Sequence, residues 1–359
     1  MNSFLNTKTI AREALPILES NLVFPALIHT DFSEEFSKQG DTIQVRKPPI
    51  YNATEFNGEI EIQDIDEGNV LVKLDKIADV SVELTAKEMA LNAEDFTKQV
   101  IEPAMVALAE KINADGLQLY KDIPNYYGEV GVAPSSLSDL AAGAKMLNDQ
   151  KAPLVGRSGV WNTEAIANFQ VLPALVNAEK SGSTDSLREG SIGRVFGIDH
   201  YFSQQVPYHE SGTASNMIVA SGTKDGTTIF DIGSFATLVK GDILQINDRN
   251  FLVVEGGTTA SGELKVILSP AVTEDDWGRD AKVLGNHTAN LMFHKSAFGF
   301  VTRPLEAARG ADSYVTSYNG LSVRVTMDYN IATKKQTLSI DTLYGFKTLY
   351  PELAVRMLG

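Results

Sequence analysis

The chain has 359 residues, 43% of them hydrophobic and 21% charged, and a formal net charge of -15. This length predicts two or three domains with a sizeable buried core. No stretch approaches the ~20 consecutive apolar residues of a membrane span, so we expect a soluble protein with no membrane contact. The absence of cysteine excludes disulfides, thiolate zinc sites and cysteine nucleophiles. The acidic charge argues against tight phosphate-driven binding of nucleic acid and leaves loose contact open.

The first residues, MNSFLNTKTIAREALPIL, lack a basic region followed by an apolar core and a small-residue cleavage site. A secretory signal is therefore not expected, and we place synthesis in a cytoplasm. Glu13 and Glu19 lie on an early helical segment. They could face a basic partner, or they could belong to an ordinary solvated helix.

The next part of the chain predicts an extended antiparallel β-arm. Residues 40–49, GDTIQVRKPP, alternate apolar and polar side chains, and the two prolines end the strand. A second strand is predicted over 58–65. Residues 69–85 contain two further strand-like runs with a short break between them.

A long helix should follow this arm. Thr85 and Glu88 form a capping-box pattern, and a second helix start is predicted at Asn92. Apolar residues then keep helical spacing to about Tyr120, and Pro103 should kink or restart the helix. From Asn92 to Tyr120 this run would span about 43 Å.

The rest of the chain mixes helices and strands. Residues 124–208 alternate helical runs, strands and glycine turns, which is typical of an α+β domain. Residues 226–285 contain short strands and turns, and they predict a small barrel-like all-β unit. Residues 322–349 predict two long strands around a turn at 332–333.

Residues 64–75, DIDEGNVLVKLD, match a calcium loop only in part. Asp64, Asp66 and Asp75 occupy the first, third and twelfth places, but Asn69 replaces the glycine that the sharp turn requires. We therefore expect a solvated acidic loop here.

A run of acidic residues marks the predicted arm: Glu55, Glu59, Glu61, Asp64, Asp66 and Glu67. Such a run is usually a solvated surface, but on a projecting arm it could dock on a neighbouring subunit's basic patch. Arg46 and Lys47 on the opposing strand could also neutralise it within one subunit. We take these eight residues as candidate intersubunit contacts.

The glycines of GSIGRVFG, residues 190–197, match neither GxGxxG nor GxxxxGK[ST], so turns are expected there. His287 and His294 would lie on opposite faces of a strand but on one face of a helix. A third metal ligand has no close candidate, so both are predicted to be structural histidines. No GxSxG or HExxH motif occurs, and no catalytic, cofactor or metal site is predicted.

The order of these elements resembles the major capsid protein of tailed bacteriophages, which has the Hong Kong 97-type fold. More narrowly, it is similar to the coat-protein branch of short-tailed Salmonella phages, whose members carry an inserted β domain. The stretches that carry the resemblance are GDTIQVRKP (40–48), the strand-to-helix passage 80–113, LREGSIGRVFGIDHYFSQQVP (187–207), NLMFHKSAFGFVTRPL (290–305) and the final hairpin. The β unit of about sixty residues is shorter than the family's insertion.

The resemblance implies an α+β fold with peripheral and axial domains. It divides the chain into an N-terminal arm (1–39), an extended β loop and peripheral strand (40–84), a spine helix (85–121), the first part of the axial domain (122–225), the inserted β-barrel-like domain (226–285), the axial return (286–320) and a peripheral C-terminal β-hairpin (321–359).

The resemblance also implies a function in assembly and no enzymatic activity. Copies of the chain would form the pentamers and hexamers of an icosahedral shell around double-stranded DNA, with a scaffolding protein and a portal as partners and no cofactor. The shell would assemble in the bacterial host cytoplasm and become the virion capsid. Two alternatives are an encapsulin-type nanocompartment shell and a metal-dependent hydrolase that uses His287, His294 and Asp275 or Asp276.

Overall fold

The computed structural model describes residues 7–30, 42–46, 69–84, 96–177, 188–222, 227–231, 235–260, 262–331, 333 and 335–359. The chain divides into two compact units. Unit 1 contains Met1–Pro25, His29–Ile112 and Phe298–Leu349; unit 2 contains Ala26–Ile28, Asn113–Ala297 and Tyr350–Gly359. Within the described ranges, no helix is long and apolar enough to cross a membrane.

Unit 1 is built on an antiparallel sheet of order β18-β21-β20-β19, with β3 also paired to β21. Its elements are α1 (Thr7–Asn21), β1 (Thr42–Arg46), β2 (Asn69–Lys73), β3 (Lys76–Leu84), η3 (Thr97–Ile101), β18 (Phe298–Arg303), β19 (Asp312–Tyr318), β20 (Leu321–Asn330) and β21 (Lys335–Thr348). Two helices, α2 (Phe24–Leu27) and α4 (Glu102–Leu117), contain the sequence boundaries between the units.

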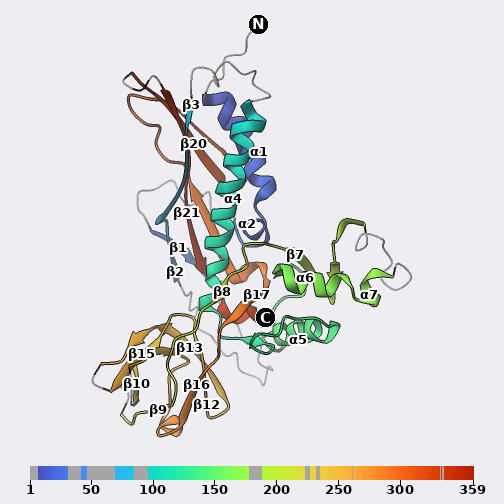
Figure 1. Cartoon of the computed structure of the whole chain (residues 1–359), viewed down its shortest axis with the longest axis vertical. Helices are drawn as coiled ribbons and strands as arrows, with labels where there is room; N and C mark the ends of the chain where they lie inside the picture. Colours follow the sequence, from blue (N-terminus) through green and yellow to red (C-terminus); the bar gives the residue numbers. More distant parts are fainter. Residues whose placement is uncertain are drawn as a thin grey trace, which may run out of the picture. The chain divides into compact units, whose positions relative to one another are not determined.

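The core of unit 1 lies between α1 and the sheet. Helix α1, blue in Figure 1, packs on β19 and β20. It buries Ile10, Ala14 and Leu18, whose spacing of four residues keeps them on one helix face. Phe298 and Phe300 of β18 are also fully buried or nearly so, and they belong to this core.

The strands of unit 1 confirm most of the predicted β pattern. Strands β1 and β2 pair antiparallel, from Thr42 opposite Lys73 to Arg46 opposite Asn69. Strands β20 and β21 form the predicted hairpin, closing with Asn330 opposite Lys335. The strand predicted over 58–65 lies outside the described residues.

The spine helix changes its winding at Pro103. The turn η3 before it is a π-helix, in which the N–H of Glu102 donates to the carbonyl of Thr97. Pro103 has no N–H to donate to the carbonyl of residue 99, and a wider turn accommodates this defect without ending the helix. The predicted restart at Pro103 is thus a change of helix type, whereas the helix starts predicted at Thr85 and Asn92 lie outside the described residues.

Unit 2 contains a mixed sheet and a separate closed barrel. The sheet and helix elements are η4 (Gln118–Asp122), β4 (Tyr126–Tyr127), α5 (Leu137–Asp149), β5 (Arg157–Trp161), α6 (Thr163–Gln170), α7 (Pro173–Val176), β6 (Gly193–Val195), β7 (Ile198–Phe202), β8 (Tyr208–His209), β17 (His287–His294), η6 (Lys295–Ala297), η7 (Pro351–Leu353) and β22 (Ala354–Leu358).

The sheet has the order β4-β22-β17-β5-β7-β6, and β8 pairs with one end of β17. Helices α5, α6 and α7 pack on it through a buried core that includes Leu140, Trp161, Phe169, Met292 and Met357. This arrangement is the α+β structure predicted for residues 124–208.

The barrel lies between β8 and β17 in the sequence, and its strands are yellow to orange in Figure 1. It closes in the order β10-β15-β13-β12-β16-β9. Its elements are β9 (Met217–Val219), β10 (Thr227–Asp231), β12 (Ile243–Ile246), β13 (Arg249–Glu255), β15 (Glu263–Ser269) and β16 (Asp280–Val283), accompanied by β11 (Thr237–Leu238), β14 (Gly257–Thr258) and η5 (Glu274–Asp276).

The barrel begins before the predicted boundary at residue 226. Strand β9 pairs with both β10 and β16, so the barrel cannot close without it. Its pattern of a buried Met217, an exposed Ile218 and a buried Val219 is too short to stand out in the sequence.

Three further predicted domain assignments differ from the two units. The final residues Tyr350–Gly359 belong to unit 2 and not to the terminal hairpin, because β22 pairs with β17 and β4 and all five of its residues are buried. The part of the predicted axial return after Ala297 belongs to unit 1, since β18 and β19 pair with β21 and β20. In the spine, unit 2 already begins at Asn113. The other predicted domain boundaries stay predictions.

Candidate functional site

The predicted intersubunit contacts fall almost entirely outside the described residues. Arg46 is described as the last residue of β1, opposite Asn69. The other seven lie outside the described ranges: Lys47, Glu55, Glu59, Glu61, Asp64, Asp66 and Glu67. This contact surface therefore stays a prediction. The acidic loop predicted over 64–75 is wrong for residues 69–73, which form strand β2, and residues 64–68 lie outside the described ranges.

The two carboxylates of α1 have partners inside unit 1. Glu13 accepts a hydrogen bond from the Thr97 hydroxyl of η3. Glu19 Oε1 accepts one from Asn319 Nδ2 at 2.8 Å. These bonds hold α1 to its own unit, which favours a structural helix over a surface reserved for a basic partner.

His287 and His294 stand at the two ends of β17, so the strand places them on opposite faces. His287 Nδ1 donates to the carbonyl of Gly285 at 2.8 Å, and His294 Nε2 donates to that of Val155 at 3.0 Å. Burial lowers the pKa of both, that of His287 to about 4. Each is thus a neutral, hydrogen-bonded histidine at neutral pH, as the structural interpretation predicts.

The residues of the hydrolase alternative do not form one site. Asp276 Oδ2 accepts from Arg249 Nη1 and from the Thr273 backbone N–H, both at 3.0 Å, while each histidine bonds a backbone carbonyl. Within the described ranges, no three His, Asp or Glu side chains are placed to hold a metal ion. The geometry gives this alternative no support.

The glycines of residues 190–197 do form turns. Phe196 and Gly197 are the two residues between β6 and β7, and their φ angles are +52° and +80°. Two positive φ angles are typical of the tight turn that matches the twist of a hairpin. Glycine adopts the second positive φ angle without strain, which explains why residue 197 is a glycine.

Five buried side chains of unit 2 form a polar cluster that sequence reasoning missed. We call it the junction cluster, and its members are Tyr120, His209, Asp242, His287 and Arg356, each 2% exposed or less. They come from η4, β8, the segment before β12, β17 and β22 respectively. Their wide spacing in the sequence leaves no motif. His287 was noticed only as a single histidine, and the other signal was a lone arginine in the apolar run AVRML.

Asp242 is the acceptor at the centre of the cluster. Its Oδ1 lies 2.9 Å from His209 Nε2, and its Oδ2 accepts from the backbone N–H groups of Val239 at 2.8 Å and Gly212 at 3.1 Å. These three donors replace the hydrogen bonds to water that burial removes from the carboxylate oxygens. Asp242 joins the barrel to β8 and to the segments on either side.

Tyr120 completes a chain of hydrogen bonds. Its hydroxyl lies 2.8 Å from His209 Nδ1, and burial raises the pKa of the phenol to about 12. The tyrosine therefore keeps its proton and its hydroxyl donates a hydrogen bond to Nδ1, so Nε2 is the nitrogen of His209 that donates to Asp242. An order of Tyr, His and Asp can relay protons, but these side chains are at most 2% exposed, and substrate has no access to them.

Arg356 is the cation of the cluster. Its Nη1 donates to the Gly241 carbonyl at 2.7 Å, and its guanidinium lies 5.2 Å from the centre of the Tyr120 ring. Burial lowers its pKa to about 10, so it stays charged at neutral pH. Its Nε and Nη2 have no hydrogen-bond partner within the described part of the chain, and neither does His287 Nε2.

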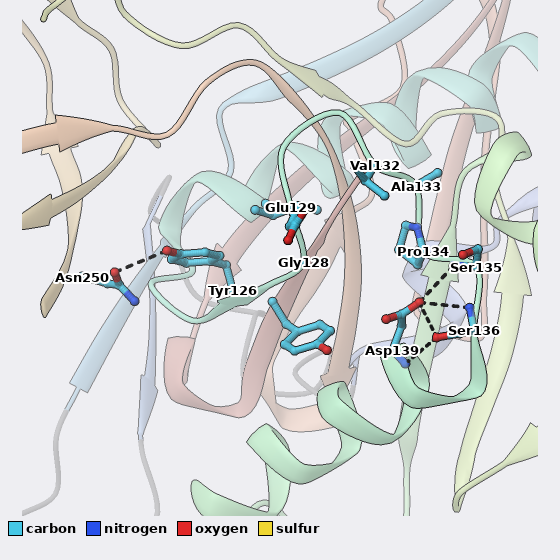
Figure 2. Close-up of a pocket in the computed structure, with 12 residues that line it drawn as sticks. Tyr126, Gly128, Glu129, Val132, Ala133, Pro134, Ser135, Ser136, Asp139 and Asn250 are labelled. Carbon is cyan, nitrogen blue, oxygen red and sulfur yellow. Dashed lines mark hydrogen bonds between the residues drawn. The ribbon is translucent and has the colours of Figure 1, made fainter. Parts of the chain in front are cut away.

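An open pocket of about 600 Å³ lies beside β4 (Figure 2). On one side, the Tyr126 hydroxyl reaches Asn250 Oδ1 at 3.4 Å. On the other, Asp139 accepts from the backbone N–H groups of Ser135 and Ser136 at 3.0 Å, as the capping box at the start of α5. The carboxylate is thus committed to the helix, and no histidine lines the pocket to activate a serine hydroxyl.

Comparison with known proteins identifies the fold. Residues 271–359 match the family model described as P22 coat protein, gene protein 5. A chain of Mycobacterium phage Che8 is 16% identical with a TM-score of 0.53, and the likeness covers 94% of this chain and 90% of that one. No curated protein matches the sequence.

Two capsids are similar at lower scores. The capsid of cyanophage P-SCSP1u is 12% identical, with coverage of 89% and 84% and a TM-score of 0.48. The mature capsid of bacteriophage PhiM1 is 12% identical, with coverage of 89% and 82% and a TM-score of 0.43. The likeness to the chain of Mycobacterium phage Che8 shows a shared fold and agrees with the predicted α+β class. The narrower resemblance to the Salmonella branch stays a prediction.

Proposed function

We propose that this chain is the major capsid protein of a tailed bacteriophage and that it self-assembles into an icosahedral shell around double-stranded DNA. The observation that carries this proposal is the match of residues 271–359 to the P22 coat protein family. That stretch contains four strands of the unit 1 sheet and the adjacent strands β17 and β22 of the unit 2 sheet. The match therefore covers elements that both units need, and the fold likeness over 94% of the chain agrees with it.

The surface of the described residues supports association between copies. Large apolar side chains are exposed at turns and strand ends, among them Leu154 at 71%, Val155 at 79% and Ile331 at 81%. Single exposed apolar residues are common on monomers, but several on the turns of one chain suit burial between subunits. Many modest contacts that close into a symmetric shell reinforce one another and still let errors dissociate.

The direct test is microscopy of the purified full-length chain. Negative-stain images and sedimentation should show closed shells or rings of five and six subunits. A small, stable oligomer under all assembly conditions would contradict the proposal. Copurifying DNA and a portal protein would distinguish a phage capsid from an encapsulin-type compartment, which no observation here favours.

We also propose that the run of acidic residues from Glu55 to Glu67 contacts a neighbouring subunit. Arg46 and Lys47 would belong to the same contact surface. The test variant replaces Glu59, Glu61, Asp64 and Asp66 by their amides. Because it removes attractive charge across an interface, it should lower assembly yield and weaken the salt dependence of assembly. The matched control replaces four barrel carboxylates: Glu255, Glu263, Glu274 and Asp275. Equal assembly by both variants and the parent chain would contradict this contact.

The proposed partners and location follow from the same function. A scaffolding protein and a portal would take part in assembly in the host cytoplasm, and the product would be the virion capsid. The net charge of -15 suits an inner wall along which packaged DNA slides with only loose contact. A shell structure with a net basic inner surface would contradict this last point.

A further inference from the structure

We propose that the junction cluster is an acid-sensitive latch that holds the root of the barrel on the sheet of unit 2. The barrel root is the backbone of Gly212 and of residues 239–242, which lie where the chain enters the barrel and where β12 begins. The latch lies within a single chain, so it can be tested independently of shell assembly.

The sheet side of the latch is one face of three neighbouring strands. His209 of β8 lies directly opposite His287 of β17, and their ring centres are 5.0 Å apart. Arg356 of β22 lies opposite Leu291, which is four residues after His287 and shares its face. These three strands therefore present two imidazoles and a guanidinium to the same side.

The barrel root supplies the matching acceptors. Asp242 Oδ1 accepts a hydrogen bond from His209 Nε2 at 2.9 Å, and the Gly241 carbonyl accepts one from Arg356 Nη1 at 2.7 Å. Two side chains of the sheet thus donate hydrogen bonds to two consecutive residues of the root. Because these groups are buried, separating root and sheet exposes donors and acceptors that lose their partners together.

His287 is the group through which acid would open the latch. Its Nδ1 donates to the Gly285 carbonyl, so in the neutral ring Nε2 carries a lone pair and no proton. A second proton would enter at Nε2, which is buried and has no acceptor among the described residues. The charged ring would then be a second buried cation on a face that already holds Arg356.

The charged neighbours on the facing elements offset this cost only in part: Asp242 favours a charge on His287, but it is the smallest of the causes that shift its pKa. In η4, Tyr120 stays protonated, and Asp122 pairs with Lys240 of the barrel root at 2.8 Å. Asp242 already accepts from three donors. The remaining neighbours, His209 in β8 and Arg356 in β22, oppose a charge on His287.

The pH window follows from the direction of the shift. Burial is the largest cause that lowers the pKa of His287 from 6.5 to about 4. The stability contributed by the neutral ring is complete above the ordinary pKa and is lost as pH falls from 6.5 towards 4. A difference of one pKa unit changes an equilibrium constant tenfold. The equilibrium constant that favours the docked over the open state would therefore fall by up to roughly 300-fold.

The experiment is hydrogen exchange of the full-length chain between pH 7 and pH 4, corrected for the intrinsic pH dependence of exchange. Peptides that contain the barrel root should lose protection as pH falls. His287→Asn keeps a donor for the Gly285 carbonyl but cannot titrate. In this variant the barrel root should therefore keep its protection from hydrogen exchange down to pH 4. The matched control is His200→Asn, because burial also lowers the pKa of His200 to about 4 outside the cluster. The control should leave the wild-type response of the root unchanged.

Three results would overturn the latch: a root whose protection does not change with pH, a folded His287→Asn variant with the wild-type response, or a His200→Asn variant that abolishes it. If His287→Asn does not fold, ¹⁵N-histidine NMR of the wild-type chain decides. The latch requires His287 to be the neutral Nδ1–H form at pH 5.5, and a His287 that titrates above pH 6 would contradict it.

Discussion

Asp242→Ala should be among the most destabilising substitutions in unit 2. The carboxylate is fully buried, and it accepts from His209 Nε2 and from the N–H groups of Val239 and Gly212. Each buried donor left without an acceptor costs about 1–3 kcal/mol. Removal also relieves the desolvation of the carboxylate and leaves room for water, so we expect a net loss of about 3–5 kcal/mol, the usual cost of removing one member of a buried charged network.

Urea unfolding measures this loss. Trp161 and Trp277 are the chain's only tryptophans, and Trp277 packs against the barrel core. In a Trp161→Phe background, fluorescence therefore reports on the barrel. Asp242→Asn should be nearly as severe as alanine, because its amide NH₂ would meet N–H donors. The exposed Asp275→Asn should change stability by less than about 0.5 kcal/mol. A loss below about 1 kcal/mol for Asp242→Ala would refute the reasoning.

Three further predictions concern other parts of the chain. Arg324→Lys should cost about 1–2 kcal/mol in thermal unfolding, because Arg324 donates from Nε at 2.9 Å and Nη2 at 2.5 Å to both oxygens of Asp341, and lysine cannot make this fork. Phe196→Asn should stabilise the chain by about 0.5–1 kcal/mol in urea, because asparagine tolerates the φ of +52° better than phenylalanine does. Unfolding free energy measured by urea titration should rise with pH between 4 and 6.5 by up to about 1.4 kcal/mol per unit for each of His200 and His287, whose pKa burial lowers to about 4, since the unfolded chain binds more protons there. Equal stability of Arg324→Lys and wild type, a destabilised Phe196→Asn, or a flat pH profile would each contradict its prediction.

Elements with a strong period were predictable from the sequence. The hairpin β20–β21 is an example, because its alternation of apolar and polar residues continues over two long strands, and a half-buried antiparallel sheet imposes that alternation. Helix α5 was likewise visible from its apolar spacing. In both cases the local pattern and the tertiary environment agree.

Strand β22 shows where local patterns fail. Its five residues, AVRML, are all buried, so no alternation distinguishes it from the end of the preceding hairpin. The chain leaves the sheet of unit 1 at Leu349, and nothing in the sequence of Tyr350 or Pro351 reveals that the next strand joins a different sheet. Only the pairing of β22 with β17 decides its place.

The candidate site was hidden for a related reason. The five residues of the junction cluster are separated by tens of positions, and each alone reads as an ordinary polar residue. His287 drew attention by its residue type, but its partner across the ladder, His209, did not, because only the pairing of β8 with β17 brings them together. The predicted acidic contacts, by contrast, depend on a second subunit that one sequence cannot place.

The position of the junction cluster has a physical reason in the topology of unit 2. The barrel has its own closed ladder and its own core around Phe230, Phe251 and Leu264, so both are complete without residues of the sheet. An apolar contact at its root would hold it with little preference for one orientation. Hydrogen bonds from His209 and Arg356 to defined acceptors instead require one register of root and sheet. We therefore interpret the buried charges as the source of orientation for the barrel, which explains why a costly arginine occupies an otherwise apolar strand.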